Sequence, residues 1–258
     1  MNPIDIDDII ALARSAGQAI MEVYDSDDVG LQIKDDDHNS PLTRADLTAH
    51  DIIVKGLEQL TPDIPVISEE STERDDSRIS HYHIWLVDPL DGTKEFLKRN
   101  GQFTVNIALI EQGSPVLGVV YAPALDLLYF GDQDGAYKQS SGSEPEEIAV
   151  NLPHDDLKAA VSASHPSPEL DDWLKAHGIA KTTAIGSSLK LCLIADGQAD
   201  VYPRLAPTME WDTAAGDAVV IAAGGVILSY PELQPLIYNK ADLHNPHFVA
   251  ASSRQLLS

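Results

Sequence analysis

Two carboxylates stand at the end of an apolar segment, where their spacing could hold a cation. In WLVDPLDGTKEF (residues 85–96), Asp88 and Asp91 follow a strand-like run and are separated only by Pro89 and Leu90. Asp-Pro and Asp-Gly are common turn dipeptides, so a plain turn would explain this loop. A stiff turn would also present both carboxylates, and the Leu90 carbonyl between them, to a metal ion.

Other acids occupy similar junctions along the chain. Glu69 and Glu70 end the apolar run IPVISEE, and Asp212 lies at the start of the helix-like segment WDTAAGDAVV. An acid at a helix N-terminus is also ordinary capping. Facing carboxylates raise one another's pKa unless a cation lies among them. Because oxygen ligands without cysteine or histidine favour Mg²⁺ over zinc, the acids together predict a magnesium site.

The N-terminal half is predicted to place these acids on a layered fold. Apolar residues recur at helical spacing over about 5–24, and a second helix fits 43–60, with Thr43 as its N-cap and Asp46 in its first turn. The polar stretch DDDHNSP (residues 35–41) is expected to be a loop. Strands are expected over 29–34, 64–70, 83–88, 103–111, 115–123 and 126–132. The later strands follow one another closely, so we expect an antiparallel meander or a mixed sheet.

The C-terminal half reads as alternating strand and helix. The segments AAVSAS, PELDDWLKAHG, TTAIG, SSLKLCLIADG, ADVYP and WDTAAGDAVVIAAGG follow one another in that way. The polar stretch over 139–147 separates the halves, which predicts an N-terminal subdomain over 1–145 and a C-terminal one over 146–258. DQDG at 132–135 is expected to be a hairpin turn, since it lacks the further ligands of a calcium loop.

Composition narrows the class of protein. The 258 residues hold 41 acids against 17 Lys plus Arg, a formal charge of −24, which disfavours nucleic acid polymers as partners. The single cysteine, Cys192, lies in an apolar run, so we expect it in the core and the protein in a reducing compartment. The acidic N-terminus does not resemble a signal peptide and no long apolar stretch follows, so we expect a cytoplasmic, soluble protein.

Three motifs resemble the inositol monophosphatase superfamily of Mg²⁺-dependent, lithium-sensitive phosphatases. They are SEES, DPLDGT and WDTAAGDAVV, in that order, and the resemblance spans nearly the whole chain. It implies an α/β fold of alternating layers (α/β/α/β/α), in two subdomains that share one active-site cleft. Within the superfamily, DPLDGTKEFLKRNGQFTVNIALI, LGVVYAP and GSSLKLCLIADGQADVYPR resemble the bisphosphate nucleotidases. Inositol monophosphatases instead have D-G-T-x-N-F where this chain has Lys94, Glu95 and Phe96.

The resemblance implies roles for individual residues. Two to three Mg²⁺ ions would be held by Glu69, Asp88, the Leu90 carbonyl, Asp91 and Asp212. The catalytic set would be Asp46, Glu69 and Thr93, with Thr93 and Asp46 paired to orient and deprotonate the attacking water. The substrate-binding set would be Glu69, Leu90, Asp91, Gly92, Thr93, Ser164, His165, Ser187, Lys190, Arg204 and Asp212. For Lys190 a solvated helix position is an equal alternative, and a histidine beside two prolines, as His165 is, usually has no specific role.

The implied activity is that of a phosphoric monoester hydrolase acting on a small nucleotide bisphosphate. It would remove the 3′-phosphate of adenosine 3′,5′-bisphosphate, a by-product of sulfate assimilation, and would need no protein partner. An inositol- or sugar-phosphate phosphatase of the same fold is the nearest alternative, and a metal-binding protein without turnover is another. The resemblance also implies peripheral association with the cytoplasmic side of the inner membrane, although no amphipathic basic helix here would mediate it.

Overall fold

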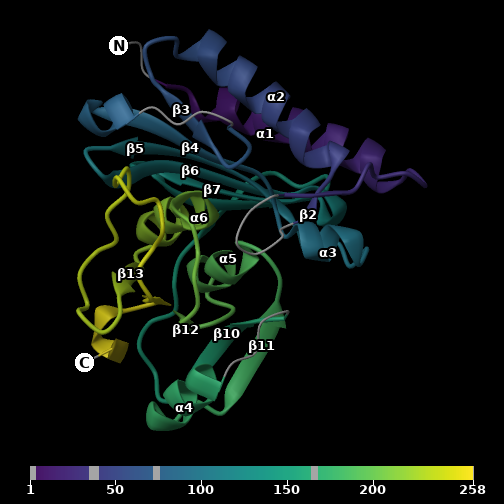
Figure 1. The fold of residues 1–258 in the computed structure, drawn as a ribbon. Coiled ribbons are helices and arrows are strands. Elements are labelled where there is room, and N and C mark those ends of the chain that lie inside the picture. Colours follow the sequence, from purple (N-terminus) through teal and green to yellow (C-terminus); the bar gives the residue numbers. More distant parts are fainter. Residues whose placement is uncertain (1–3, 35–40, 72–75, 164–167, 258) are drawn as a thin grey trace.

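The outer layer of the molecule consists of two long helices that cover one face of a large sheet (Figure 1). The computed structural model describes residues 4–34, 41–71, 76–163 and 168–257. Helix α1 (Ile6–Tyr24) is capped by the Asp5 side chain and buries Ile9, Ala13, Ala16 and Ile20 on one face. Helix α2 (Arg44–Leu60) lies beside α1 and buries Ala49, Ile53 and Leu57 at four-residue spacing. Both predicted helices are confirmed within one residue.

The larger sheet has seven strands in the order β3-β4-β5-β6-β7-β8-β9. Only β3 and β4 run parallel, so the predicted mixed sheet is confirmed. Its strands are β3 (Val66–Ser68), β4 (His83–Asp91), β5 (Thr104–Glu111), β6 (Ser114–Ala122), β7 (Leu127–Asp132), β8 (Gly135–Ser140) and β9 (Glu146–Ile148). The predicted hairpin turn at 132–135 joins β7 to β8.

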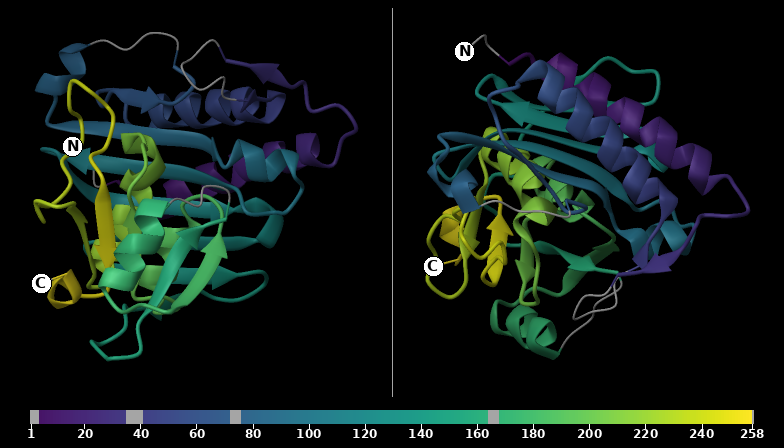
Figure 2. Two further views of the ribbon diagram at one scale, coloured as in Figure 1. Left: turned by 60° about the horizontal axis from the view of Figure 1, so that its bottom comes forward. Right: turned by 45° about the horizontal axis from the view of Figure 1, so that its top comes forward.

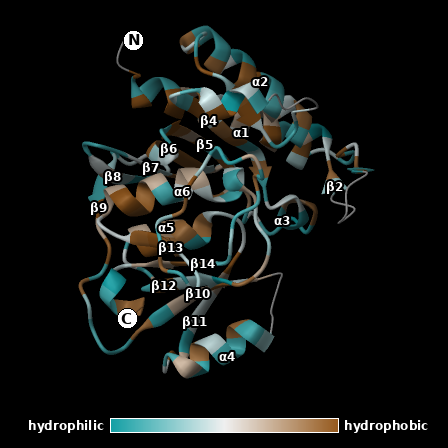
Figure 3. Ribbon diagram, turned by 60° about the vertical axis from the view of Figure 1, so that its left-hand side comes forward, coloured by the Kyte–Doolittle hydropathy of each residue, from teal (hydrophilic) through white to brown (hydrophobic). Residues whose placement is uncertain are grey.

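A second helical layer lies under this sheet (Figure 1). Helix α6 (Glu210–Ala222) packs against β5, β6 and β7, and α5 (Leu189–Ala195) packs against α6. Gly118 in β6 allows this close approach, because a Cβ atom there would lie 2.2 Å from the Ala215 carbonyl oxygen. Figure 3 shows hydrophobic residues where the helices meet the sheet. This packing fixes the N-terminus of α6, which carries Asp212.

The smaller sheet forms the next layer, and α4 (Pro168–Ala176) lies beyond it (Figures 1 and 2). Its order is β11-β10-β12-β14-β13, with β10, β11 and β12 parallel. The strands are β10 (Lys158–Ser162), β11 (Lys181–Ile185), β12 (Val201–Arg204), β13 (Val226–Ser229) and β14 (Phe248–Ala251). The alternating α/β/α/β/α layers match the predicted fold. The boundary between subdomains stays a prediction, and the chain leaves the larger sheet only after Ile148.

Several local predictions need correction. The polar stretch 139–147, predicted to separate the two halves, contains the end of β8 and most of β9, because both strands have partners within the sheet. The expected strand over 29–34 is reduced to β1 (Gln32–Ile33), which pairs with β2 (Pro41–Leu42) at the end of the predicted loop. Residues 35–40 of that loop lie outside the described residues. None of the described helices is long and apolar enough to cross a membrane.

Candidate active site

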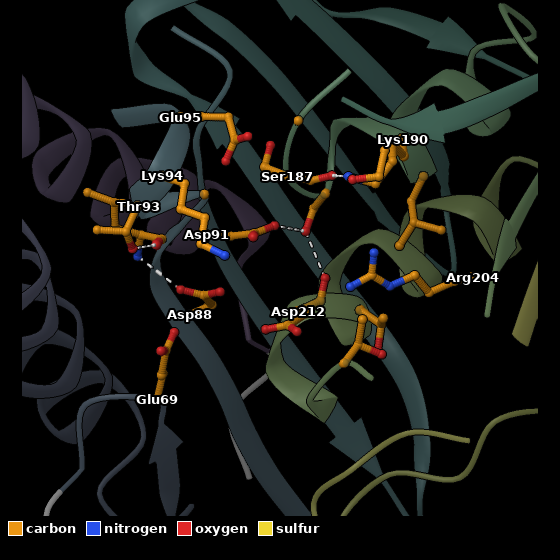
Figure 4. Close-up of a pocket in the computed structure, with 18 of the residues that line it drawn as sticks. Glu69, Asp88, Asp91, Thr93, Lys94, Glu95, Ser187, Lys190, Arg204 and Asp212 are labelled. Carbon is orange, nitrogen blue, oxygen red and sulfur yellow. Dashed lines mark hydrogen bonds between the residues drawn. The ribbon is translucent and has the colours of Figure 1, made fainter. Parts of the chain in front are cut away.

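A pocket of about 230 Å³ lies between the end of β4 and the elements α5, β12 and α6 (Figure 4). We call Glu69, Asp88, Leu90, Asp91 and Thr93 the N-terminal wall, and Ser187, Ser188, Lys190, Arg204 and Asp212 the C-terminal wall. All of these residues line the pocket, as does Gly92. Of the other residues predicted from the sequence, Asp46 contacts Thr93, and Ser164 and His165 lie outside the described residues.

The N-terminal wall is built on a bulged strand end rather than on the predicted turn. Strand β4 continues to Asp91, with a register shift between Asp88 and Asp91, because Asp91 pairs opposite Thr104 of β5. The bulge accommodates Pro89, which cannot donate a ladder hydrogen bond. Asp88 Oδ1 accepts a hydrogen bond from the Leu90 N–H at 3.0 Å, and the Leu90 side chain is buried in the core. The strand therefore holds both carboxylates on well-supported backbone.

Gly92 connects the strand to helix α3 (Thr93–Leu97) and has a left-handed conformation with φ of 92°. A Cβ atom at this position would lie 3.2 Å from the Gln102 carbonyl oxygen. A side chain at residue 92 would therefore face both backbone strain and a close contact. Gly92 is the N-cap of α3, so the N–H groups of Gly92 and Thr93 lie at the start of that helix.

Asp46 and Thr93 lie within reach of each other, although they are far apart in sequence. The Thr93 hydroxyl donates to Asp46 Oδ1 at 3.3 Å and lies 3.4 Å from the Leu90 carbonyl oxygen. Asp46 Oδ2 accepts from the Thr43 N–H at 2.7 Å and from the Thr43 hydroxyl at 2.6 Å. The bond from the Thr43 N–H belongs to the capping box of α2, and both bonds leave the other carboxylate oxygen facing Thr93. Burial raises the pKa of Asp46.

The pocket carboxylates destabilise one another's charged forms. Burial, followed by the charges of Glu69, Asp91 and Asp212, raises the pKa of Asp88 well above its ordinary value. Burial and the charge of Asp91 raise the pKa of Asp212 to about 8. Burial also raises the pKa of Asp91, while the Lys190 charge and hydrogen bonds from Ser188 oppose that rise. A cation among these groups would relieve the repulsion.

Lys34 is a contact of the N-terminal wall that the sequence did not reveal. Its ammonium group donates to Glu69 at 2.7 Å and to Glu70 at 2.6 Å. Burial lowers the pKa of Lys34, but the two carboxylates outweigh that effect and raise it. Burial, together with the Glu69 charge, raises the pKa of Glu70 to about 7. Lys34 precedes an acidic loop, and nothing in the neighbouring sequence indicates that it pairs with an acid 35 residues further along the chain.

The C-terminal wall supplies the positive charge. Lys190 is only 7% exposed, and its ammonium group donates to the Ser187 carbonyl oxygen and lies 5.5 Å from the Tyr202 ring centre. Burial lowers the pKa of Lys190 to about 8, against the charge of Asp91. Arg204 donates to the Pro207 carbonyl oxygen at 3.0 Å. The alternative of Lys190 as a solvated helix residue is wrong, because its side chain is buried at the pocket.

The donor chemistry of the pocket fits a hard divalent cation. The groups in the pocket that could bind a cation are carboxylates, hydroxyls and a backbone carbonyl, with neither cysteine nor histidine among the lining residues. Across the described ranges, however, no three His, Cys, Asp or Glu side chains already have the spacing of a formed metal site. The carboxylates of Glu69, Asp88, Asp91 and Asp212 would be the ligands.

Comparison with known proteins assigns the chain and its fold to one family. The model of the Inositol monophosphatase family matches residues 5–257. This chain therefore belongs to the inositol monophosphatase family, as its motifs predicted, and its layered fold is that of a phosphatase.

Particular relatives lie in one branch of that family. The chain is 52% identical to the 3′(2′),5′-bisphosphate nucleotidase CysQ of Salmonella typhimurium over 220 residues, covering 85% of this chain and 88% of the relative. It is 48% identical to the CysQ of Escherichia coli, covering 94% and 98%. The crystal structure of CysQ from Bacteroides thetaiotaomicron superimposes with a TM-score of 0.82 at 43% identity, over 94% of both chains.

Proposed function

We propose that this protein is a Mg²⁺-dependent 3′(2′),5′-bisphosphate nucleotidase that converts adenosine 3′,5′-bisphosphate to AMP and phosphate. The observation that carries the proposal is the match to CysQ nucleotidases at 48–52% identity over most of the chain. The pocket supports it independently, because an acidic wall faces a wall with two cationic side chains. In a nucleotide bisphosphate, one phosphate could lie at the acidic wall with its cations, and the second phosphate could lie at the cationic side chains of the other wall.

The N-terminal wall would act on the phosphate that is removed. Mg²⁺, when bound, offsets the charge of the phosphate dianion and lowers the pKa of water. Glu69, Asp88, the Leu90 carbonyl, Asp91 and Asp212 would hold it. The number of ions, two to three, is part of the proposal.

Thr93 and Asp46 would orient the attacking water. The Thr93 hydroxyl donates a hydrogen bond to Asp46 Oδ1. Its lone pairs are therefore free to accept a hydrogen bond from a water molecule in the pocket. Asp46 is buried, and burial makes its carboxylate a stronger base than an exposed aspartate. A water oriented in this way is suited to in-line attack on phosphorus.

The C-terminal wall would bind the second phosphate and the nucleoside. Lys190 and Arg204 line the pocket opposite the acids and carry the charge that an anionic group needs. The Ser187 hydroxyl is buried without a hydrogen-bond partner among the described residues, so a ligand group could use it. Roles for Ser164 and His165 in the nucleoside pocket, the cytoplasmic location and independence from protein partners stay predictions.

A substrate panel tests the proposal. Phosphate release would be measured for adenosine 3′,5′-bisphosphate, adenosine 2′,5′-bisphosphate and inositol 1-phosphate, each with Mg²⁺ and with excess chelator. We expect Mg²⁺-dependent release with kcat/KM highest for a nucleotide bisphosphate. Preference for inositol 1-phosphate would favour a sugar-phosphate phosphatase. The absence of turnover on every substrate would favour a metal-binding protein.

A further inference from the structure

Ser188 belongs to the C-terminal wall and contacts the N-terminal wall, and its side chain has three close polar neighbours. The Asn106 side-chain amide donates to the Ser188 hydroxyl at 2.8 Å. That hydroxyl lies 2.8 Å from Asp91 Oδ2 and 2.7 Å from the Asp212 backbone carbonyl oxygen (Figure 4). One side chain thus contacts the Asp91 carboxylate and the Asp212 backbone, and both residues belong to the candidate metal site.

The Ser188 hydroxyl has two acceptors nearby but only one proton to donate. A hydroxyl has one proton to donate, and the Asn106 amide can only donate to it. An ionised Asp91 carboxylate and the Asp212 carbonyl can only accept, so they compete for the single Ser188 proton. Hydrogen bonds to an ionised acceptor are the stronger ones, which favours the bond to Asp91. The one proton can bond both acceptors only as a shared, three-centre hydrogen bond, and in that arrangement the hydroxyl joins the end of β4 to the first turn of α6.

The local structure around Ser188 favours this use over an ordinary one. Ser188 is the N-cap of α5, and serine at that position usually accepts a hydrogen bond from the helix backbone. Here its side chain makes no capping hydrogen bond. Ser188 is 4% exposed and Asn106 is 1% exposed, so water does not compete well for these contacts. Asn106 also lies opposite Asp88 in the β4–β5 ladder, so its position is fixed by the same strand that carries the acids.

We propose that Ser188, oriented by Asn106, is a positioning residue that fixes Asp91 relative to Asp212 and thereby sets their spacing for a divalent cation. This inference rests on the proposed metal site and not on the identity of the substrate. Ser188 itself touches neither metal nor substrate in this role. Partners of this kind hold metal ligands in place, and their loss typically weakens metal binding by about 10- to 100-fold.

Calorimetric titration of the full chain with Mg²⁺, without substrate, tests the inference. Ser188→Ala removes the hydroxyl and keeps the backbone N–H, and we expect the Kd for Mg²⁺ to rise at least about tenfold. The Mg²⁺ concentration for half-maximal activity should rise in parallel, while kcat at saturating Mg²⁺ should change far less. Ser188→Thr, which keeps a hydroxyl, should bind Mg²⁺ more tightly than Ser188→Ala.

The matched control is Ser252→Ala. Ser252 is also 4% exposed, and its hydroxyl has no hydrogen-bond partner in the described part of the chain. It follows β14 and does not line the pocket. The substitution therefore repeats the loss of a buried hydroxyl without touching the two walls, and it should leave the Kd for Mg²⁺ unchanged.

A double-mutant cycle tests the part played by Asn106. If Asn106 acts through Ser188, Asn106→Ala should weaken Mg²⁺ binding less than Ser188→Ala, and the double variant should match Ser188→Ala alone. If Ser188→Ala does not fold, Asn106→Ala still tests the inference. It leaves the Ser188 hydroxyl in place but removes the group that orients it, so Mg²⁺ binding should still weaken.

Three results would overturn the inference. They are Mg²⁺ affinity of Ser188→Ala within twofold of wild type, equal weakening by Ser252→Ala, and fully additive losses in the double variant. Failure to hydrolyse nucleotide bisphosphates would instead contradict the proposed function, and the calorimetric comparison would still decide the role of Ser188.

Discussion

The two walls of the pocket differ in charge and in the way that the chain builds them. The N-terminal wall is acidic, and most of it comes from one bulged strand end over residues 88–93. The C-terminal wall takes Lys190, Arg204 and Asp212 from three separate elements, α5, β12 and α6. The first wall is therefore local in sequence, whereas the second depends on how the C-terminal layers pack.

This difference suggests a division of labour. An acidic wall can approach a phosphate only through cations, so its residues should decide whether the reaction occurs at all. A wall with cationic side chains can contact an anion directly, so its residues should decide which substrate is chosen. The predictions below test that division, beginning with the largest expected effect.

Removal of divalent cations should abolish activity. The N-terminal wall presents only oxygen donors, and its carboxylates repel a phosphate dianion in the absence of cations. Phosphate release should fall to the background rate in excess EDTA and return with added Mg²⁺, and the family resemblance implies inhibition by lithium. An enzyme that keeps its full rate in excess chelator would contradict the assignment of this wall.

Substitution of the Thr93–Asp46 pair should lower kcat by about two orders of magnitude or more. Thr93→Ala removes the hydroxyl that faces the pocket. Asp46→Asn replaces one carboxylate oxygen by an amide that donates, so the Thr93 hydroxyl loses either its acceptor or its orientation.

The double variant distinguishes one shared role from two. If Thr93 and Asp46 act as a unit, the double variant should lose little more kcat than either single change. Independent multiplication of the two losses would show that the residues have separate functions.

Changes in the C-terminal wall should alter substrate choice more than turnover. A charge-assisted contact to phosphate is typically worth about 1.5–3 kcal/mol. Arg204→Ala and Lys190→Ala should therefore lower kcat/KM for adenosine 3′,5′-bisphosphate by roughly 10- to 100-fold. The value for inositol 1-phosphate, which has no second phosphate, should change much less.

The ratio of the two substrates is the measurement that decides this point. Lys55→Ala is a suitable control, since Lys55 is exposed and pairs with Asp51 one helical turn away, outside the pocket lining. Each substitution also removes a donor to a backbone carbonyl, that of Ser187 for Lys190 and that of Pro207 for Arg204, so both variants are needed. An unchanged ratio in both variants would locate the second anion site elsewhere.

The smallest effect on activity is expected for an acid outside the pocket lining, which should influence stability instead. Asp217 lies on α6, five residues after Asp212, and Tyr238 donates to its Oδ2 at 2.7 Å. Its Oδ1 is buried without a hydrogen-bond partner in the described structure. Burial raises the pKa of Asp217 from 3.8 to about 7.

Protein stability should respond to this shift in a defined direction. Between pH 3.8 and about 7 the native state keeps the Asp217 proton and the unfolded state has lost it. The free energy of unfolding therefore falls as pH rises through that window, by up to roughly 4 kcal/mol at 1.36 kcal/mol per pH unit. Asp217→Asn should stabilise the protein relative to wild type more at pH 8 than at pH 4.5. Urea unfolding at both pH values measures this, and an equal difference at both would contradict it.

Features encoded by short stretches of sequence were predictable. The capping box of α2 is visible as Thr43 and Asp46 ahead of a periodic apolar run, and the structure confirms it. The acids of the N-terminal wall are close in sequence and follow apolar strands, so their type and spacing were informative. The alternation of strand and helix indicated the layered architecture in the same way.

Features that depend on distant partners were not predictable. Strand β9 is polar and short, and it forms because β8 lies beside it. Strands β13 and β14 were missed because they pair with each other across the long connection between Ser229 and Phe248. Lys34 is important because it contacts Glu69, which lies 35 positions away in the sequence. Ser188 is important because it contacts Asp91, which lies 97 positions away. Serine and lysine are common at surfaces, so nothing in their immediate sequence distinguishes them.

Asp46 has a consequence for how this enzyme can change over generations. One of its carboxylate oxygens completes the N-terminal cap of α2, and the other faces Thr93. Selection for folding and selection for catalysis therefore act on the same side chain. A library screened only for soluble expression should already be depleted of substitutions at residue 46, even in a background inactivated at Thr93. By contrast, the same screen should accept many substitutions at Arg204, whose side chain bonds the nearby Pro207 carbonyl and caps no helix.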